Sequence, residues 1–333
     1  MKRSLGRSGV AVSPLGFGCW AIGGPFSYEG RADGWGSVDD DESLRALRRA
    51  FELGITFFDT ADVYGTGHSE TLLGKAFAGK RDQVVISTKF GNVFDAATRQ
   101  VTETSTSPTY IRAACASSLQ RLGTDYIDLY LIHLSSLPPA EAEQAIGTLE
   151  ELRQEGTIRA YGWSTDDLGC AQLIAGRPGC AAIEHELNLF NDSPDLIQLC
   201  EQEEVASLNR SPLAMGLLSG KFDASVRLPR DDVRGAGHDW VPYFENGAPK
   251  PEFLDRLAAV REILTSEGRT LAQGALAWVW ARSTHTIPIP GFKTVAQAEE
   301  NAGTLERGPL GEAALEQIDA LLRPPPRPHA PRA

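Results

Sequence analysis

The chain has few cysteines, a minority of basic residues and no long apolar run. Its 333 residues include five cysteines, an odd number without a CxxC pair. Neither a disulfide framework nor a zinc site is therefore indicated, and we interpret the cysteines as small core residues. Acidic residues outnumber basic ones by 44 to 32, which gives a net charge of −12. We therefore expect no nucleic-acid partner, because such a partner requires basic groups facing its phosphates.

Membrane and secretory signals are also missing. No segment approaches the roughly 20 apolar residues that span a bilayer. The first residues, MKRSLG, lack the apolar stretch of a signal peptide. The sequence thus predicts a cytoplasmic protein with no membrane partner.

Several common catalytic motifs are absent or incomplete. The six histidines show no HExxH spacing, and there is no GxSxG motif, which disfavours metal-dependent and serine hydrolysis. The segment 16–21 fits GxGxxA, but a Gly-Gly-Pro run follows it where a dinucleotide fingerprint requires a helix. The segment 216–221 faintly resembles a phosphate loop, but its first glycine comes one residue too late and Phe222 replaces the Ser or Thr that would bind magnesium. We predict no metal site.

What the sequence does contain is an alternation of short β-rich runs and amphipathic helical patterns. The eight predicted strands are Leu15–Cys19, Thr56–Asp59, Val84–Lys89, Tyr126–His133, Ile158–Ser164, Ala181–Leu187, Ala206–Asn209 and Thr286–Pro290. The predicted helices are Asp41–Leu53, Ser69–Phe77, Pro108–Leu122, Ala140–Glu155, Asp167–Ala175, Ser193–Glu203, Glu252–Glu267, Thr270–Arg282 and Thr294–Ala302. This alternation predicts an α/β protein with a single (β/α)8 TIM barrel.

Three segments outside the repeat complete the predicted architecture. Residues Arg3–Ser13 contain a turn between two short alternating runs, which predicts a hairpin that caps the bottom of the barrel. The irregular stretch Pro212–Pro251 follows the seventh strand, where it is expected to form a lid. We expect one barrel domain over residues 1–323 and a flexible tail over 324–333, which holds five prolines.

Four polar side chains occur at or just after the carboxyl ends of predicted strands. Asp59 ends the second strand, Lys89 the third and His133 the fourth. Tyr64 lies in the loop after Asp59. Alone, each has an ordinary structural explanation as a cap, a surface charge, a core histidine or a packing residue. Together they indicate a catalytic site, because barrel enzymes place their catalytic groups at these strand ends.

At these residues the chain resembles the aldo-keto reductase family over nearly its whole length. The segments that carry the resemblance are GITFFDTADVYG (54–65), STK (87–89), DYIDLYLIH (125–133), SPL (211–213), GLLSGK (216–221), PIPG (288–291) and EN (300–301). The resemblance implies a barrel that binds NADP(H) in an extended pose without a Rossmann domain. It also implies a catalytic tetrad of Asp59, Tyr64, Lys89 and His133.

The chemistry of this tetrad can be argued from its residue types. Hydride transfer to a carbonyl carbon builds negative charge on the oxygen, so a proton donor is needed nearby, and Tyr64 can serve. A neighbouring ammonium, Lys89, would lower the high pKa of the phenol, and Asp59 would hold that lysine by a buried ion pair. A neutral His133 would orient the substrate oxygen.

The resemblance also implies the cofactor contacts. The loop Ser211–Lys221 would wrap the pyrophosphate, and Gly291–Asn301 would hold the adenosine end, with Lys293 at the 2′-phosphate. The complete set of implied cofactor residues is Trp20, Asp59, Ser164, Thr165, Glu184, Arg210, Ser211, Leu213, Gly216, Leu218, Gly220, Lys221, Gly291, Lys293, Thr294, Gln297, Glu300 and Asn301.

Three positions depart from the family pattern around the nicotinamide. Thr165 stands where an Asn is usual, Glu184 where a Gln is usual, and Arg210 where an aromatic residue often stacks on the ring. A carboxylate at Glu184 would favour the oxidised, cationic ring. Pairing of Glu184 with Arg210 would cancel that preference.

The leading functional hypothesis is NADP(H)-dependent oxidation and reduction of a small-molecule carbonyl or alcohol. The alternatives are a nucleotide-binding regulatory subunit with little turnover, and a lyase or isomerase that uses Lys89 as a Schiff base. Aromatic residues in the loops either line a substrate pocket or pack the loops. They are Phe26, Tyr28, Trp35, Phe94, Trp240, Tyr243 and Phe244.

Overall fold

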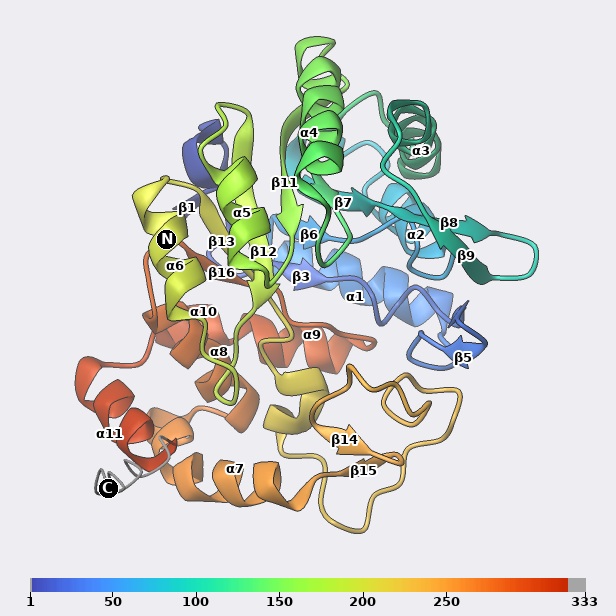
Figure 1. The fold of residues 1–333 in the computed structure, drawn as a ribbon. Helices are drawn as coiled ribbons and strands as arrows, with labels where there is room; N and C mark the ends of the chain where they lie inside the picture. The colour runs from blue at the N-terminus through green and yellow to red at the C-terminus, as the bar shows by residue number, and fades with distance from the viewer. Residues whose placement is uncertain (1, 323–333) are drawn as a thin grey trace, which may run out of the picture.

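Eight parallel strands form the centre of the molecule, shown as a ribbon in Figure 1. A computed structural model describes residues 2–322, so the expected tail at 324–333 lies outside the described residues. The strands are β3 (Phe17–Gly18), β6 (Phe57–Asp59), β7 (Val85–Phe90), β10 (Ile127–Ile132), β11 (Ile158–Ser164), β12 (Cys180–Glu186), β13 (Ala206–Arg210) and β16 (Thr286–Pro288). They follow the order β16-β13-β12-β11-β10-β7-β6-β3.

The first and last strands meet and close the barrel. The backbone amides of Gly16 and Gly18 donate to the carbonyls of Pro288 and Pro290, each at 3.0 Å. A Cβ atom on Gly18 would lie 2.9 Å from the carbonyl oxygen of Ile289, too close for any side chain. The GxG spacing of this strand therefore serves barrel closure, and β3 is followed by turns rather than a helix.

Helices surround the strands as the sequence predicted, with boundaries that agree to within three residues. They are α1 (Asp40–Glu52), α2 (His68–Ala76), α3 (Pro108–Leu122), α4 (Pro139–Gln154), α5 (Leu168–Ala175), α6 (Pro194–Gln202), α7 (Pro251–Leu264), α8 (Leu271–Ala281) and α9 (Val295–Ala302). Local chemistry fixes their ends. The side chains of Asp39 and Ser107 accept hydrogen bonds from the first turns of α1 and α3, and Gly123 ends α3 in the left-handed conformation.

An apolar cluster fills part of the barrel interior and closes it at the amino ends of the strands. Inward-facing side chains such as Phe57, Leu129 and Leu208 form one buried cluster with Leu5 and Val12. The last two belong to the antiparallel pair β1 (Arg3–Ser4) and β2 (Ala11–Val12) and its flanks. This arrangement confirms the predicted hairpin cap. All five cysteines are buried and unpaired, as expected of small core residues.

Several elements were not predicted. A small side sheet joins β4 (Ser27–Tyr28) and β5 (Arg31–Ala32) to the hairpin β8 (Asn92–Asp95) and β9 (Gln100–Thr104), and this hairpin projects from the barrel in Figure 1. Two helices, α10 (Thr304–Arg307) and α11 (Glu312–Leu322), follow α9. Strands this short and polar form through pairing with distant segments, which local sequence patterns do not reveal.

The long stretch after β13 is well packed rather than loose. It contains a 3-10 segment at Ala214–Ser219 and the short strands β14 (Phe244–Glu245) and β15 (Ala248–Pro249). Val233 and Val241 are buried in one apolar cluster with side chains of α7 and α8. Within residues 2–322, no helix has the length and apolar character needed to cross a membrane.

Candidate active site

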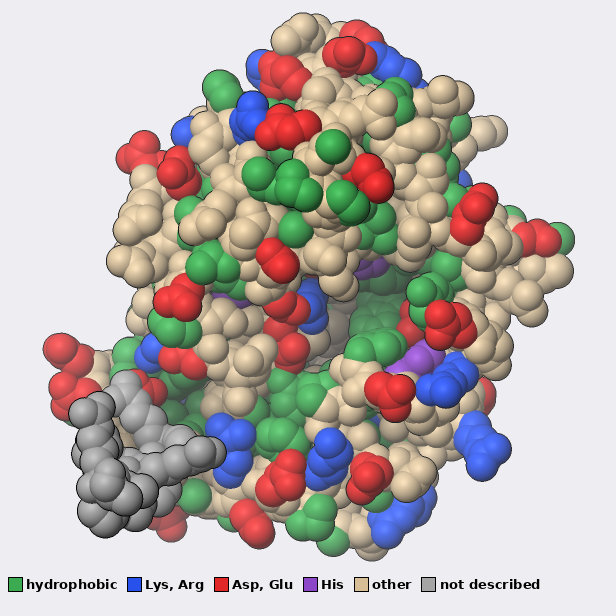
Figure 2. All heavy atoms as spheres, in the orientation of Figure 1, with side chains coloured by type: hydrophobic (Ala, Val, Ile, Leu, Met, Phe, Trp, Pro, Cys, Tyr) green, Lys and Arg blue, Asp and Glu red, His purple; other side chains and the backbone are tan. Residues whose placement is uncertain are grey.

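A cavity of about 680 Å³ opens at the carboxyl ends of the barrel strands, and the face drawn in Figure 2 is hollowed at its centre. Its walls come from strand ends, from the segment after β3, from the side sheet and from the stretch after β13. Asp59, Tyr64 and His133 line this cavity, and Lys89 lies buried behind them. The structure therefore brings the four predicted catalytic residues together.

Lys89 and Asp59 form an ion pair that is sealed from solvent. The Lys89 Nζ atom donates to Asp59 Oδ2 at 2.6 Å and to the Thr60 carbonyl oxygen at 2.9 Å. The Ser87 hydroxyl donates to Asp59 Oδ1 at 2.8 Å. Burial acts to lower the pKa of Lys89, but Asp59 and Glu184 raise it, and the net pKa lies above the ordinary value. The lysine is therefore an ammonium at neutral pH.

Tyr64 lies between this ammonium and the cavity. The Lys89 Nζ atom is 5.3 Å from the centroid of the Tyr64 ring. The His133 ring meets Tyr64 edge-on at 5.7 Å between centroids, and the Trp20 ring stacks on it at 5.8 Å. Burial raises the pKa of Tyr64, and Lys89 opposes that rise. The phenol is thus held beside a fixed positive charge.

His133 is neutral at physiological pH. Burial lowers its pKa well below the usual range, and the cations Lys89 and Arg210 lower it further. Its Nδ1 atom is buried without a hydrogen-bond partner among residues 2–322. A neutral imidazole at the cavity wall can orient a polar ligand without changing the charge of the site.

Glu184 contacts the same lysine, whereas Arg210 is held by other residues. Glu184 Oε2 lies 3.3 Å from Lys89 Nζ, and Glu184 Oε1 accepts from the Ser164 hydroxyl at 3.1 Å. Arg210 forms an ion pair with Asp166 and approaches Glu186 at 3.9 Å. The ion pair considered from the sequence, between Glu184 and Arg210, is thus replaced by two separate pairings.

A group of cations lines the end of the cavity near the last strand, made up of Lys221, Lys293 and Arg234. Lys293 Nζ donates to the carbonyl oxygens of Trp35 at 2.9 Å and Ser37 at 2.8 Å. Burial lowers the pKa of Lys221 and of Lys293. Cations that are partly removed from water are suited to hold the phosphates of a dinucleotide.

Arg234 was not singled out from the sequence. Its guanidinium donates to both Asp232 carboxylate oxygens, at 2.8 and 2.6 Å, and to the Met215 carbonyl. The same group stacks over the Trp35 ring, 4.4 Å from its centroid. Arg234 thereby links the segment after β3 to the stretch after β13, across the top of the cavity.

The loop Ser211–Lys221 is strained next to this cation group. Ser211, Ala214 and Met215 all have positive φ, at 51°, 47° and 54°. Residues other than glycine rarely adopt that backbone conformation, and such strain is concentrated at ligand sites. The amides of Gly216 and Leu218 both donate to the Leu213 carbonyl, so they already have partners inside the loop.

Most of the predicted cofactor residues line the cavity. They are Trp20, Asp59, Ser164, Thr165, Glu184, Arg210, Ser211, Leu213, Gly216, Lys221, Gly291, Lys293 and Gln297. Five others are absent from its wall: Leu218, Gly220, Thr294, Glu300 and Asn301. Some of these have structural contacts: Leu218 is buried in an apolar cluster, Thr294 caps α9, and Asn301 donates to the Gly291 carbonyl.

The cavity wall also contains polar residues that the sequence reasoning missed, among them Asp33, Asn92 and Glu186. Asp33 lies in the loop after β5 and Asn92 in the unpredicted side sheet, so neither carried a strand-end signal, whereas Glu186 ends β12 and could have been found by that signal. Three of the loop aromatics, Tyr28, Trp35 and Trp240, line the cavity. The other four pack within the loops: Phe26, Phe94, Tyr243 and Phe244.

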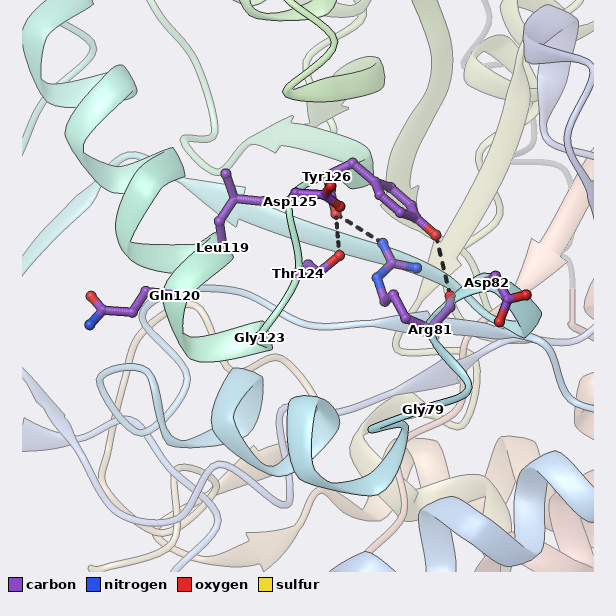
Figure 3. A pocket seen from close by; sticks show the side chains of 9 residues that line it. All are labelled: Gly79, Arg81, Asp82, Leu119, Gln120, Gly123, Thr124, Asp125 and Tyr126. Carbon is purple, nitrogen blue, oxygen red and sulfur yellow. Dashed lines mark hydrogen bonds between the residues drawn. The ribbon is translucent and has the colours of Figure 1, made fainter.

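A second hollow, of about 800 Å³, lies at the amino ends of β7 and β10 (Figure 3). Arg81 points toward the Tyr126 ring there, and Arg159 packs on the same ring, with guanidinium carbons 4.1 and 3.8 Å from its centroid. The Asp128 carboxylate accepts from both arginines and from the Ile86 amide. Because both guanidinium groups are paired with the Asp128 carboxylate, this hollow has the character of a structural cluster.

The comparisons with known proteins agree with the geometry. The model of the aldo/keto reductase family matches residues 14–323. Aldo-keto reductase YhdN of Bacillus subtilis is 31% identical over 89% of this chain and 86% of its own length. Glycerol dehydrogenase AKR11B4 from Gluconobacter oxydans has a TM-score of 0.79 and 30% identity, with 97% of this chain and 96% of that one covered. An aldo-keto reductase from Klebsiella pneumoniae in complex with NADPH has a TM-score of 0.68 and 26% identity, with 98% and 97% covered. The chain therefore belongs to the aldo-keto reductase family.

Proposed function

We propose that the protein is an NADP(H)-dependent oxidoreductase that interconverts small-molecule carbonyls and alcohols, with Tyr64 as the proton donor and acceptor. The observation that carries this proposal is the buried Lys89 ammonium, held by Asp59 and 5.3 Å from the Tyr64 ring at the cavity wall. Among the relatives, the matching enzyme of Schizosaccharomyces pombe is named as an NADP(+) aldo-keto reductase, and the Klebsiella structure contains NADPH.

When bound, the nicotinamide supplies or accepts the hydride; the residues of the chain supply the proton and the orientation. Tyr64 gives its phenolic proton to the carbonyl oxygen during reduction and takes it back during oxidation. Lys89 stabilises the tyrosinate that forms, and Asp59 keeps the ammonium in place. His133, as a neutral imidazole, donates a hydrogen bond to the substrate oxygen.

Lys221 and Lys293 are proposed to hold the cofactor phosphates, and Ser164, Thr165 and Glu184 to contact the nicotinamide end. The cavity suits this cofactor because it has cations at one end and buried polar atoms at the other. Arg234 would lie over the phosphates. Most of its donors are already paired with Asp232 and Met215, so few remain to contact the phosphates.

The substrate class we propose is a small hydroxylated aldehyde, ketone or alcohol. The substrate side of the cavity combines the rings of Trp20 and Trp240 with polar groups on Tyr28, Asp33 and Asn92. Flat rings and convergent polar groups suit polyols and sugars. One structural neighbour is named a glycerol dehydrogenase, in keeping with such a substrate.

The remaining assignments are also proposals. Residues 1–323 would act as one barrel domain, and the protein would be cytoplasmic, because five unpaired buried cysteines fit a reducing compartment. The Schiff-base alternative is disfavoured, because Asp59 and Glu184 raise the pKa of Lys89 and leave little neutral amine for nucleophilic attack.

Replacement of the phenol tests the proposal directly. Tyr64→Phe should lower kcat by about 10²- to 10⁴-fold, the usual contribution of a general acid. NADPH affinity, measured by fluorescence titration, should change only a few-fold. Tyr126→Phe is the matched control, because that ring lies at the opposite end of the barrel. Turnover above about a tenth of wild type in Tyr64→Phe would show that another group donates the proton. If the wild type bound NADPH but oxidised it with none of the aldehydes, ketones and sugars tried, the regulatory alternative would stand.

A further inference from the structure

Glu184 places a second carboxylate on the catalytic lysine. Its side chain is only 2% exposed, and its Oε2 atom is 3.3 Å from Lys89 Nζ. Asp59 holds the same ammonium at 2.6 Å. One buried cation therefore faces two buried carboxylates. If both were ionised, the cluster would carry a net negative charge while almost wholly shielded from solvent, which is costly.

The charged and titratable groups around Glu184 respond differently to pH. Burial and Asp59 raise the pKa of Glu184 to about 7, against the lowering effect of Lys89 and Arg210. The pKa of Lys89 is raised, so Lys89 remains an ammonium, and the pKa of His133 is lowered, so His133 remains neutral. Burial raises the pKa of the nearby Cys19 thiol, which stays protonated. Of these groups, Glu184 is the one that changes charge near neutrality.

The pKa of Tyr64 depends on the charge of Glu184. Burial raises its pKa, Lys89 lowers it, and the carboxylates of Asp59 and Glu184 raise it. A protonated Glu184 leaves Asp59 as the single counter-charge to Lys89. An ionised Glu184 adds a second counter-charge and weakens the pull of the ammonium on the phenolic proton.

We propose that Glu184 is a positioning residue that, by gaining and losing a proton beside Lys89, sets how tightly Tyr64 holds its own proton. Protonated Glu184 favours the tyrosinate that alcohol oxidation requires. Ionised Glu184 favours the phenol that carbonyl reduction requires. The inference rests on the proposed role of Tyr64 and extends it, because it makes the preferred direction of the reaction depend on pH.

The kinetic test compares wild type with Glu184→Gln across pH. A neutral amide imitates the protonated acid, so the ratio of variant to wild-type kcat/KM for alcohol oxidation, measured with NADP+ saturating, should depend on pH. From about pH 6 to above about pH 8 this ratio should rise roughly tenfold, and the variant should lose reduction earlier than wild type as the pH rises, since one unit charge near the phenol is worth on the order of a factor of ten. Asp128→Asn is the matched control, another buried strand carboxylate at the far end of the barrel. A ratio of variant to wild type that stays constant with pH would overturn the inference.

A spectroscopic test needs no turnover. The infrared difference spectrum of wild type minus Glu184→Gln, without cofactor, should contain the carbonyl stretch of a protonated carboxylic acid at low pH. That band should disappear with a midpoint near neutrality. An absent band, or a midpoint in the ordinary range of an exposed glutamate, would also overturn the inference.

The two proposals fail in distinguishable ways. If Tyr64→Phe keeps its turnover, the proposed function of Tyr64 is wrong whatever Glu184 does. If Tyr64→Phe is inactive while Glu184→Gln shows a constant ratio and no infrared band, only the role of Glu184 is wrong. Recovery of the pH dependence in Glu184→Asp would show that the charge, and not the shape, of this side chain carries the effect.

Discussion

The two ends of the barrel each bury a carboxylate with a cation, in opposite proportions. At the amino end, one carboxylate, Asp128, has two cations, Arg81 and Arg159. At the carboxyl end, one cation, Lys89, has two carboxylates, Asp59 and Glu184. Asp128 also accepts from the Ile86 amide, whereas Glu184 Oε2 is left without a hydrogen-bond partner among residues 2–322.

This difference in charge balance distinguishes a cluster that stabilises the fold from a cluster that can take part in a reaction. Asp128 is fully compensated, and both of its arginines reach solvent, with side-chain exposures of 16% and 51%. Such a cluster holds β7 and β10 together. The Lys89 cluster has one cation for two carboxylates and is almost wholly shielded from solvent, so a proton on Glu184 would balance its charge. Perturbed ionisable groups of this kind mark reactive sites.

The largest contrast should come from removing one cation at each end. Lys89→Met should reduce kcat by at least about 10²-fold, because the phenol loses its neighbouring positive charge. Arg159→Met should leave kcat unchanged and alter the free energy of unfolding by no more than about 1 kcal/mol, because its side chain is half exposed. Steady-state kinetics and urea unfolding of both variants measure the contrast. Similar kcat values for Lys89→Met and Arg159→Met would break it.

Neutralising one carboxylate at each end should change stability in opposite directions. Because the pKa of Glu184 is raised from 4.5 to about 7, its contribution to stability is present below pH 4.5 and is lost as the pH rises through 7. Glu184→Gln should therefore be more stable than wild type at about pH 8, by up to about 3 kcal/mol, and should gain little at about pH 5.

Asp128→Asn should lose about 1.5–3 kcal/mol at both pH values, because charged hydrogen bonds to the two arginines are weakened. Thermal and urea unfolding at the two pH values would measure both variants. A loss of stability in Glu184→Gln at alkaline pH would mean that its carboxylate is as well compensated as that of Asp128.

The smallest effect concerns the cations of the cavity. Lys293→Ala should weaken NADPH binding by roughly tenfold and NADH binding much less, since only NADPH carries the 2′-phosphate that the ammonium could pair with. Lys293 also holds the carbonyls of Trp35 and Ser37, so a modest loss common to both cofactors is expected. Fluorescence titrations with NADPH and NADH separate the two contributions. Equal losses for both would assign Lys293 a structural role alone.

Much of the fold and part of the site could be predicted because the signals are local. The alternating patterns placed all eight strands and the helices between them, such as α3. Asp59, Lys89 and His133 were recognised because each ends a strand, and parallel strands in a barrel bring these ends together. The side sheet was missed because Ser27–Tyr28 and Gln100–Thr104 become strands only by pairing with each other and with β5 and β8.

The sequence by itself determined the alternation that makes the barrel and the identity of the groups at its mouth, because both follow from the spacing of residues along one segment. Only the tertiary structure decided which charge faces which. Glu184 on β12 and Lys89 on β7 are three strands apart in the sheet, and they meet because the barrel is closed. Arg210 pairs with Asp166 and Glu186 for the same reason. Strand order, register and burial decide which ions meet, and a linear pattern of residues contains none of these.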